Sequence, residues 1–189
     1  MKKLVVIIFL VFGGVALAQE GNKNLVYGQF SVLGGDANDG GSFTGSGYSI
    51  GYSRYIWNHL YADFNIGAFH YKSKGGSHYF LEDEEESYWN MKHWSLGIGY
   101  DLVRERKLTV SGELALLNLS NVIVDEVWMT DGEITFRSTG RIRDKSLLVN
   151  IKGLYNFSDN WMGIATLGYG FGVQRYQSTQ LKVGFGYRF

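Results

Sequence analysis

Leu181-Lys182-Val183-Gly184-Phe185-Gly186-Tyr187-Arg188-Phe189, the final stretch of the sequence, decides the fold. Every second position is apolar or aromatic: Leu181, Val183, Phe185, Tyr187 and Phe189. The alternate positions are small or charged: Lys182, Gly184, Gly186 and Arg188. Successive side chains of a β-strand point to opposite faces, so this strand has one apolar and one polar face. Such a strand is typical of a transmembrane β-barrel, with the apolar face toward lipid and the polar face toward the lumen.

This segment resembles the C-terminal signature strand of bacterial outer-membrane proteins. The resemblance implies that the strand is an assembly signal, read by the barrel assembly machinery through its terminal Phe189. The residues of that signal are Leu181, Val183, Phe185, Tyr187 and Phe189.

The N-terminus predicts export. Lys2 and Lys3 form a basic start, residues 4–15 are an apolar run, and Ala16-Leu17-Ala18 matches a small-residue cleavage site. A run of this length indicates a secretory signal peptide rather than a membrane-spanning helix, which needs about 20 apolar residues. We therefore expect a signal peptide over residues 1–18, an outer-membrane β-barrel domain over residues 19–189, and localisation in the bacterial outer membrane.

The composition excludes several classes of protein. The 18 Lys and Arg balance the 18 Asp and Glu, so no basic field favours nucleic acid as a partner. The chain has no Cys, which excludes disulfides and thiolate metal sites. It also has no Pro but 26 Gly, and a chain without Pro keeps its backbone N–H groups for strand ladders.

Alternating segments recur along the whole chain and predict an all-β, antiparallel, up-and-down barrel. Each is close to the 9–11 residues that a tilted strand needs to cross a bilayer. The eight predicted strands are residues 24–33, 47–56, 60–71, 93–102, 108–117, 146–157, 161–173 and 181–189. Short turns alternate with longer loops between them, as in outer-membrane barrels with both termini in the periplasm. Glycines on the inward face fit a crowded, narrow lumen better than the solvent face of a soluble barrel.

One long connection contains a further hairpin signal. Asp131-Gly132 stands between two β-prone runs, residues 122–128 and 133–137. Asp125 and Glu126 are adjacent, so a spanning strand here would turn one acid toward lipid. We therefore expect a hairpin that projects above the membrane, with a ten-stranded barrel as the alternative.

These features together are similar to those of the small outer-membrane barrel family, which includes the OmpX, OmpA-barrel and opacity-protein types. An eight-stranded barrel is filled by side chains, so inward charges should pair with one another. The predicted lumen network consists of Asp63, His93, Asp101, Glu113, Lys152, Lys182 and Arg188.

Two charged segments are candidate interaction sites in the outside loops. The first is the acidic run Glu82, Asp83, Glu84, Glu85 and Glu86, which could bind divalent cations or a basic surface, or could be a solvated tip. The second consists of Arg137, Arg141, Arg143 and Lys145. These cations precede a predicted strand at the level where the phosphates of outer-membrane lipopolysaccharide would lie.

Catalytic motifs are nearly absent. His93-Trp94-Ser95 resembles the His-x-Ser of outer-membrane lipid A deacylases, but the alternation turns both residues inward. No Gly-x-Ser-x-Gly elbow, zinc motif or phosphate loop is present, and no cofactor is expected. The sequence thus favours a non-enzymatic barrel acting through its extracellular loops in surface interaction, adhesion or envelope integrity. The alternatives are a narrow channel for small or apolar solutes and a lipid-modifying enzyme.

Overall fold

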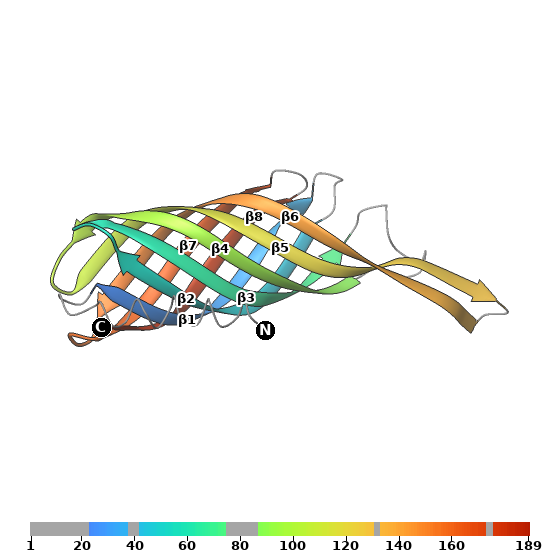
Figure 1. Cartoon of the computed structure of the whole chain (residues 1–189), viewed down its shortest axis with the longest axis horizontal. Helices are drawn as coiled ribbons and strands as arrows, with labels where there is room; N and C mark the ends of the chain where they lie inside the picture. The colour runs from blue at the N-terminus through green and yellow to red at the C-terminus, as the bar shows by residue number, and fades with distance from the viewer. Residues whose placement is uncertain (1–22, 38–41, 75–86, 131–132, 173–175) are drawn as a thin grey trace, which may run out of the picture.

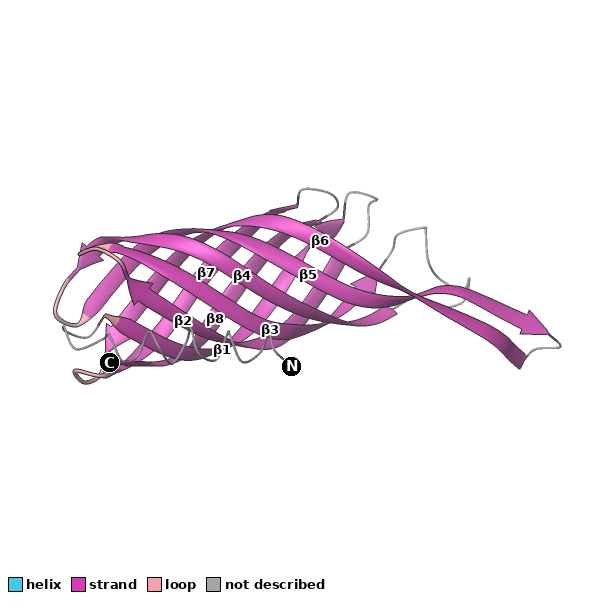
Figure 2. Cartoon of the chain, viewed as in Figure 1, coloured by secondary structure: helices cyan, strands magenta, loops and turns pink. Residues whose placement is uncertain are grey.

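A computed structural model describes residues 23–37, 42–74, 87–130, 133–172 and 176–189. All of the regular structure in these residues is β-strand (Figure 2). The strands are β1 (Asn24–Ala37), β2 (Ser42–Tyr55), β3 (Leu60–Lys74), β4 (Ser87–Arg104), β5 (Leu108–Thr130), β6 (Glu133–Asn156), β7 (Trp161–Gly172) and β8 (Tyr176–Arg188). Within this part of the chain, no helix is both long and apolar enough to cross a membrane.

The eight strands form one closed barrel in sequence order, and each strand pairs antiparallel with the next. β8 pairs back onto β1 and closes the sheet, with Leu25 opposite Arg188. The ends of the chain also bond to each other, since the Asn24 and Phe189 backbones exchange hydrogen bonds of 3.0 and 2.9 Å. The predicted eight-stranded, up-and-down topology is confirmed, and the ten-stranded alternative is wrong.

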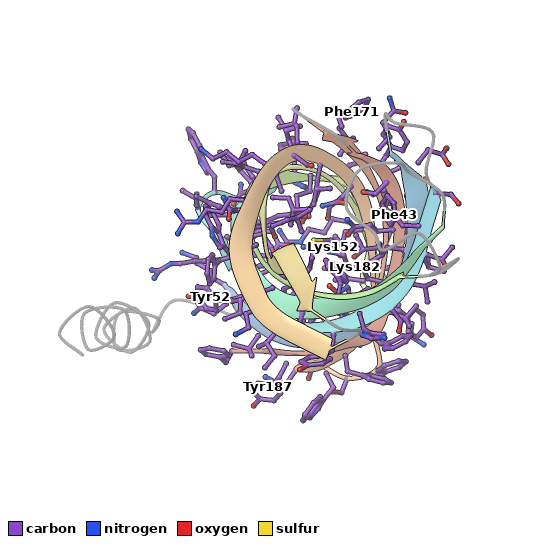
Figure 3. All side chains as sticks on the ribbon, turned by 90° about the vertical axis from the view of Figure 1, so that its right-hand side faces the viewer. Phe43, Tyr52, Lys152, Phe171, Lys182 and Tyr187 are labelled. Carbon is purple, nitrogen blue, oxygen red and sulfur yellow. The ribbon has the colours of Figure 1, made fainter. Side chains whose placement is uncertain are left out.

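The outer face of the barrel carries an apolar belt that the alternation predicts. Exposed large apolar residues follow every second position of each strand, for example Leu96, Ile98 and Tyr100 on β4. The residues between them are buried in the lumen. In Figure 3, which looks along the barrel, Phe171 and Tyr187 lie outside the ring of strands, whereas Lys152 and Lys182 lie inside it. Because isolated strands cannot satisfy their backbone groups in lipid, closure of the sheet is what allows this belt to face a bilayer.

β5 and β6 are much longer than the sequence pattern predicts. They contain 23 and 24 residues, against 12 in β7. Beyond the barrel they remain paired with each other, from Val122 opposite Arg141 to Thr130 opposite Glu133. This extension, residues 121–142, projects past the other strands in Figures 1 and 2. The predicted projecting hairpin is therefore confirmed, but its arms continue β5 and β6 rather than forming a separate loop.

Other strand ends also differ from the prediction. β2 begins at Ser42 rather than Gly47, and β8 begins at Tyr176 rather than Leu181. The alternation identifies only the portion of each strand that separates lipid from lumen. Above that level the outward positions of β2 and β8 are polar, as at Ser42, Thr44, Gln177 and Thr179, so the strands continue without the apolar outer face that marks the spanning part.

Candidate functional site

The lumen is divided into layers along the barrel axis. A central layer is charged and polar, and it lies between two apolar clusters. The cluster on the side of the short turns contains Leu25, Tyr27, Leu154, Met162 and Ile164. The cluster on the side of the extension contains Leu33, Phe43, Phe69, Ala115, Leu117, Leu119 and Leu148. The sequence predicts a polar lumen, so these apolar clusters are a departure from the expectation.

Lys152 on β6 is the centre of the charged layer. Its Nζ lies 2.7 Å from Glu113 Oε2 on β5 and 3.3 Å from Asp63 Oδ1 on β3. All three side chains are buried, with Lys152 only 3% exposed. A buried ion costs several kcal/mol unless it is paired, and Lys152 is the shared ion-pair partner of two carboxylates that would otherwise repel each other.

Two tyrosines complete the environment of these charges. Tyr27 donates to both oxygens of Asp63 at 2.6 Å, and Tyr61 donates to Glu113 Oε2 at 3.2 Å. Their rings also flank the ammonium of Lys152, with centroids 5.2 and 5.1 Å from Nζ. This arrangement combines charge-assisted hydrogen bonds with cation–π attraction.

Two glycines make room for the same tyrosines. A Cβ added to Gly51 would overlap the ring of Tyr27, and one added to Gly99 would overlap the ring of Tyr61. The inward position of these glycines is therefore needed for the rings to reach the carboxylates. Sequence reasoning missed the tyrosines, although Tyr61 shares an inward face with Asp63 two residues away.

Lys182 on β8 lines the same central cavity as Lys152, Asp63 and Glu113. Within the described residues no hydrogen bond or ion pair falls to its ammonium, although it is only 6% exposed. The cavity measures about 10 Å³, which is close to the space that one water molecule needs. The two lysines and two acids balance in charge across this layer.

Asp101 and Arg188 lie apart from that layer, at the end with the short turns. Asp101 accepts hydrogen bonds from Ser111 at 2.7 Å and from Tyr55 at 3.0 Å. Arg104 Nε lies 4.0 Å from Asp101 and its guanidinium covers the Tyr55 ring. Arg188, which is half-buried, directs Nη2 toward the sulfur of Met162 at 3.8 Å. The predicted lumen charges thus fall into separate groups rather than one network.

His93 lies between the charged layer and the apolar cluster near the extension. Its ring stacks on Phe69 at a centroid distance of 4.2 Å, and Nε2 lies 3.1 Å from Asn65 Oδ1. Ser95 is inward and buried on the same strand. Among the described residues no hydrogen bond joins His93 to Ser95, so the pair does not form the contact by which a base activates a serine.

The loop candidates are only partly within the described residues. The acidic run Glu82–Glu86 lies outside them. Arg137 and Arg141 belong to the extension, where the structure describes the backbone of β6 but not their side chains. Arg143 and Lys145 have exposed side chains just below the extension. The segment of the predicted assembly signal forms the greater part of β8, with Leu181, Val183, Phe185 and Tyr187 on the outer face.

Known structures of the same shape are bacterial outer-membrane barrels. OprG of Pseudomonas aeruginosa matches with a TM-score of 0.60 and 12% identity, covering 89% of this chain and 98% of that one. Ail, the attachment invasion locus protein of Yersinia pestis, has a TM-score of 0.59 and 13% identity, covering 89% and 99%. Neisserial surface protein A has a TM-score of 0.53 and 18% identity, covering 88% and 97%. No protein-family model and no curated protein matches the chain.

These matches identify the class of the fold. The chain has the architecture of the small eight-stranded outer-membrane β-barrels, which confirms the resemblance drawn from the sequence at the level of fold. At such low identities the likeness carries no particular activity from any one of them to this chain.

Proposed function

We propose that this protein is an integral outer-membrane barrel that acts at the cell surface through the β5–β6 extension, in surface interaction, adhesion or envelope integrity. The observation that carries the proposal is the extension itself. It continues the barrel wall as a paired ribbon beyond the apolar belt (Figure 1), on the side away from the short turns. A surface ligand would meet this part of the described chain first.

The filled lumen argues against the alternative of a channel. Along its axis, ions would meet an apolar cluster, a charge-balanced layer and a second apolar cluster. The cavity that the described residues form in the central layer measures about 10 Å³, and the one in the apolar cluster on the side of the extension measures about 20 Å³. In planar bilayers we expect the inserted protein to be silent, and discrete conductance steps would contradict the closed lumen.

One neighbour suggests a probe for the surface role. Ail has been solved with the heparin analogue sucrose octasulfate. The extension of the present chain contains Arg137 and Arg141, and Arg143 follows directly below it. Sulfated polysaccharide is therefore a suitable ligand for a first test of adhesion through the extension.

The register defines a trimmed variant for that test. Val122 lies opposite Arg141, so residues 123–140 can be replaced by Asn-Gly, which favours a two-residue hairpin turn. Cells carrying the full chain should attach to heparin-coated surfaces, whereas cells carrying the trimmed variant should not. Equal attachment of the two, with equal amounts of barrel in the membrane, would contradict a role of the extension.

Export and assembly belong to the same proposal. Residues 1–18 would be removed as a signal peptide, and the β8 segment ending in Phe189 would be read by the barrel assembly machinery. N-terminal sequencing of the mature protein tests the first statement, and the fate of a Phe189 variant, given below, tests the second.

A further inference from the structure

Three exposed cations lie side by side on the outer wall of the barrel, just above the apolar belt. Lys92 is on β4, and Arg143 and Lys145 are on β6. We call these three residues the basic patch. Lys92 is opposite Ser120 of β5, and Ser120 is opposite Arg143, so the patch crosses three neighbouring strands.

The strand geometry sets the size of the patch. Adjacent strands are about 4.8 Å apart, which separates the backbones of Lys92 and Arg143 by about 10 Å. Arg143 and Lys145 are two residues apart on one strand, or about 7 Å. Three positive charges therefore lie within the width of a single lipid headgroup that carries more than one anionic group.

The level of the patch is fixed by its neighbours. Two residues below Lys92 on β4 is Trp94, and two residues below Lys145 on β6 is Leu147, which are 41% and 40% exposed on the lipid-facing side. The patch thus begins where the apolar belt ends, on the side of the extension. In an outer membrane with the short turns in the periplasm, this is the headgroup level of the outer leaflet.

In the part of the chain that the structure describes, the patch has no acidic partner. Among the described residues, no hydrogen bond or ion pair involves the side chain of Lys92, Arg143 or Lys145. The outward positions between them are the neutral Asn118 and Ser120. Unpaired cations held close together against a membrane surface attract anionic headgroups.

The opposite wall differs in charge. Above the belt on β8, β1 and β2, the described outward side chains are neutral or acidic: Gln177, Thr179, Asp36, Ser42 and Thr44. Among the described residues, the exposed Lys and Arg above the belt therefore lie on β4 and β6 and not on these three strands. The asymmetry indicates one lipid position on the barrel.

We propose that the basic patch binds the phosphates of a phosphorylated glycolipid of the outer leaflet, whose acyl chains would pack against Trp94, Leu116 and Leu147. Lysine and arginine both form charge-assisted hydrogen bonds with phosphate oxygens. The site rests on the outer-membrane location proposed above but not on any role of the extension.

The test compares two triple variants that lose the same charge at opposite ends of the barrel. The first is K92Q/R143Q/K145Q, and the control is K23Q/R106Q/K107Q at the end with the short turns, where all three residues are exposed. Each is folded into phosphatidylcholine nanodiscs and titrated with bisphosphorylated lipid A, and bound lipid is counted by native mass spectrometry. The wild type and the control should bind alike, and the patch variant should bind at least about tenfold more weakly.

Several outcomes would overturn the proposal. One is equal binding by the patch variant and the control, and another is equal binding of lipid A and dephosphorylated lipid A by the wild type. Equal affinity for phosphatidylglycerol would show that the patch attracts any anionic lipid. Loss of heparin attachment in the patch variant with lipid A binding intact would assign the patch to a soluble polysaccharide. The trimmed variant keeps the patch, so it should bind lipid A normally even if the surface role of the extension fails.

Discussion

β5 and β6 belong both to the barrel wall and to the extension, and their side chains have different surroundings in the two regions. In the barrel, each side chain of β5 and β6 faces either lipid or a packed lumen, and the alternation is strict from Leu108 to Leu119. In the extension, each strand has only the other as a neighbour. Its register shifts between Val124 and Glu126 and again between Trp128 and Met129.

The difference shows what enforces the pattern. The one register shift that interrupts the described pairing of β4 with β5, between Asp101 and Val103, lies at the turn end of the strand. A β-bulge in the middle of the wall would send every following residue to the wrong environment, whereas in the extension it changes only the twist of the ribbon. The first shift falls at Asp125-Glu126, the adjacent acids that argue against a spanning strand in the sequence. The comparison predicts that substitutions are costly in the wall and tolerated in the extension.

The largest effect should come from the centre of the lumen. Lys152→Ala leaves Asp63 and Glu113 buried without their counter-ion, and we expect a loss of about 3–5 kcal/mol in unfolding free energy. Denaturant titration in lipid vesicles measures it. Arg137→Ala in the extension is the matched cationic change and should alter stability by less than about 0.5 kcal/mol.

A companion variant tests the reason for that loss. Lys152→Met combined with Lys182→Met, Asp63→Asn and Glu113→Gln removes all four charges of the layer and should recover much of the stability, because no ion is left unpaired. If this quadruple variant is no more stable than Lys152→Ala, packing rather than charge balance holds the layer together.

The next largest effect concerns the lipid face. Leu96→Arg or Ile98→Arg places a charge against the hydrocarbon and should cost about 2–4 kcal/mol near the midplane. Val122→Arg in the extension provides the comparison and should be nearly neutral. Harmless arginines at 96 and 98 would mean that the outward face of β4 does not contact lipid.

A smaller effect on stability is expected at the end of the chain. Phe189→Ser removes one ring at the rim, which costs about 1 kcal/mol or less because the site is only partly buried. In cells, however, the inserted amount should fall severalfold if the assembly machinery reads Phe189, while folding into detergent is unaffected. Normal accumulation of the variant in the outer membrane would contradict the assembly signal. Arg188→Ala is the control, because it changes the adjacent residue, which points into the lumen, and leaves Phe189 in place.

The smallest effect should follow removal of the extension. A two-stranded ribbon is marginally stable alone, so replacing residues 123–140 by Asn-Gly should change barrel stability by less than about 1 kcal/mol. Heat-modifiable migration and denaturant midpoints measure the change. A large loss would show that the extension supports the wall, and would break the division between the two regions.

The same division explains how much the sequence predicts. The number and order of the strands, and the side to which each residue points, follow from the alternation. Lipid favours apolar residues such as Leu96, and the lumen favours polar residues such as Ser95, at the equivalent positions of every strand. The predicted charges at Asp63, Glu113, Lys152 and Lys182 do lie in one layer, since all four side chains point into the narrow lumen and line the same small cavity. Which of them pair depends on the register between β3, β5 and β6, which the periodicity of a single strand does not contain.

Two features have no periodic signal. The apolar clusters of the lumen include Leu117 and Leu148, inward residues whose neighbours Leu116 and Leu147 face outward and are also apolar, so the two faces look alike in the sequence. The upper parts of β5 and β6 contain the β-prone runs 122–128 and 133–137 without a strict alternation, so they predict a separate hairpin rather than a continuation of the two strands. The basic patch was visible only in part: Arg143 and Lys145 stand out in the sequence, but Lys92 joins them through two steps of strand pairing.

Because β1 pairs with β8, the closed barrel would keep its shape if the chain began and ended at a different turn. Because the Asn24 and Phe189 backbones are hydrogen-bonded to each other, a short linker could join the two ends and a new pair of ends could be opened at the Glu105–Lys107 turn. Such a circular permutant would keep every strand pair of the barrel but would finish on β4, with Arg104 in place of the terminal Phe. If the last strand carries the assembly signal proposed above, the closed sheet and that signal are separable properties of one chain. A permutant that folds in vitro yet fails to reach the membrane would show the two separately.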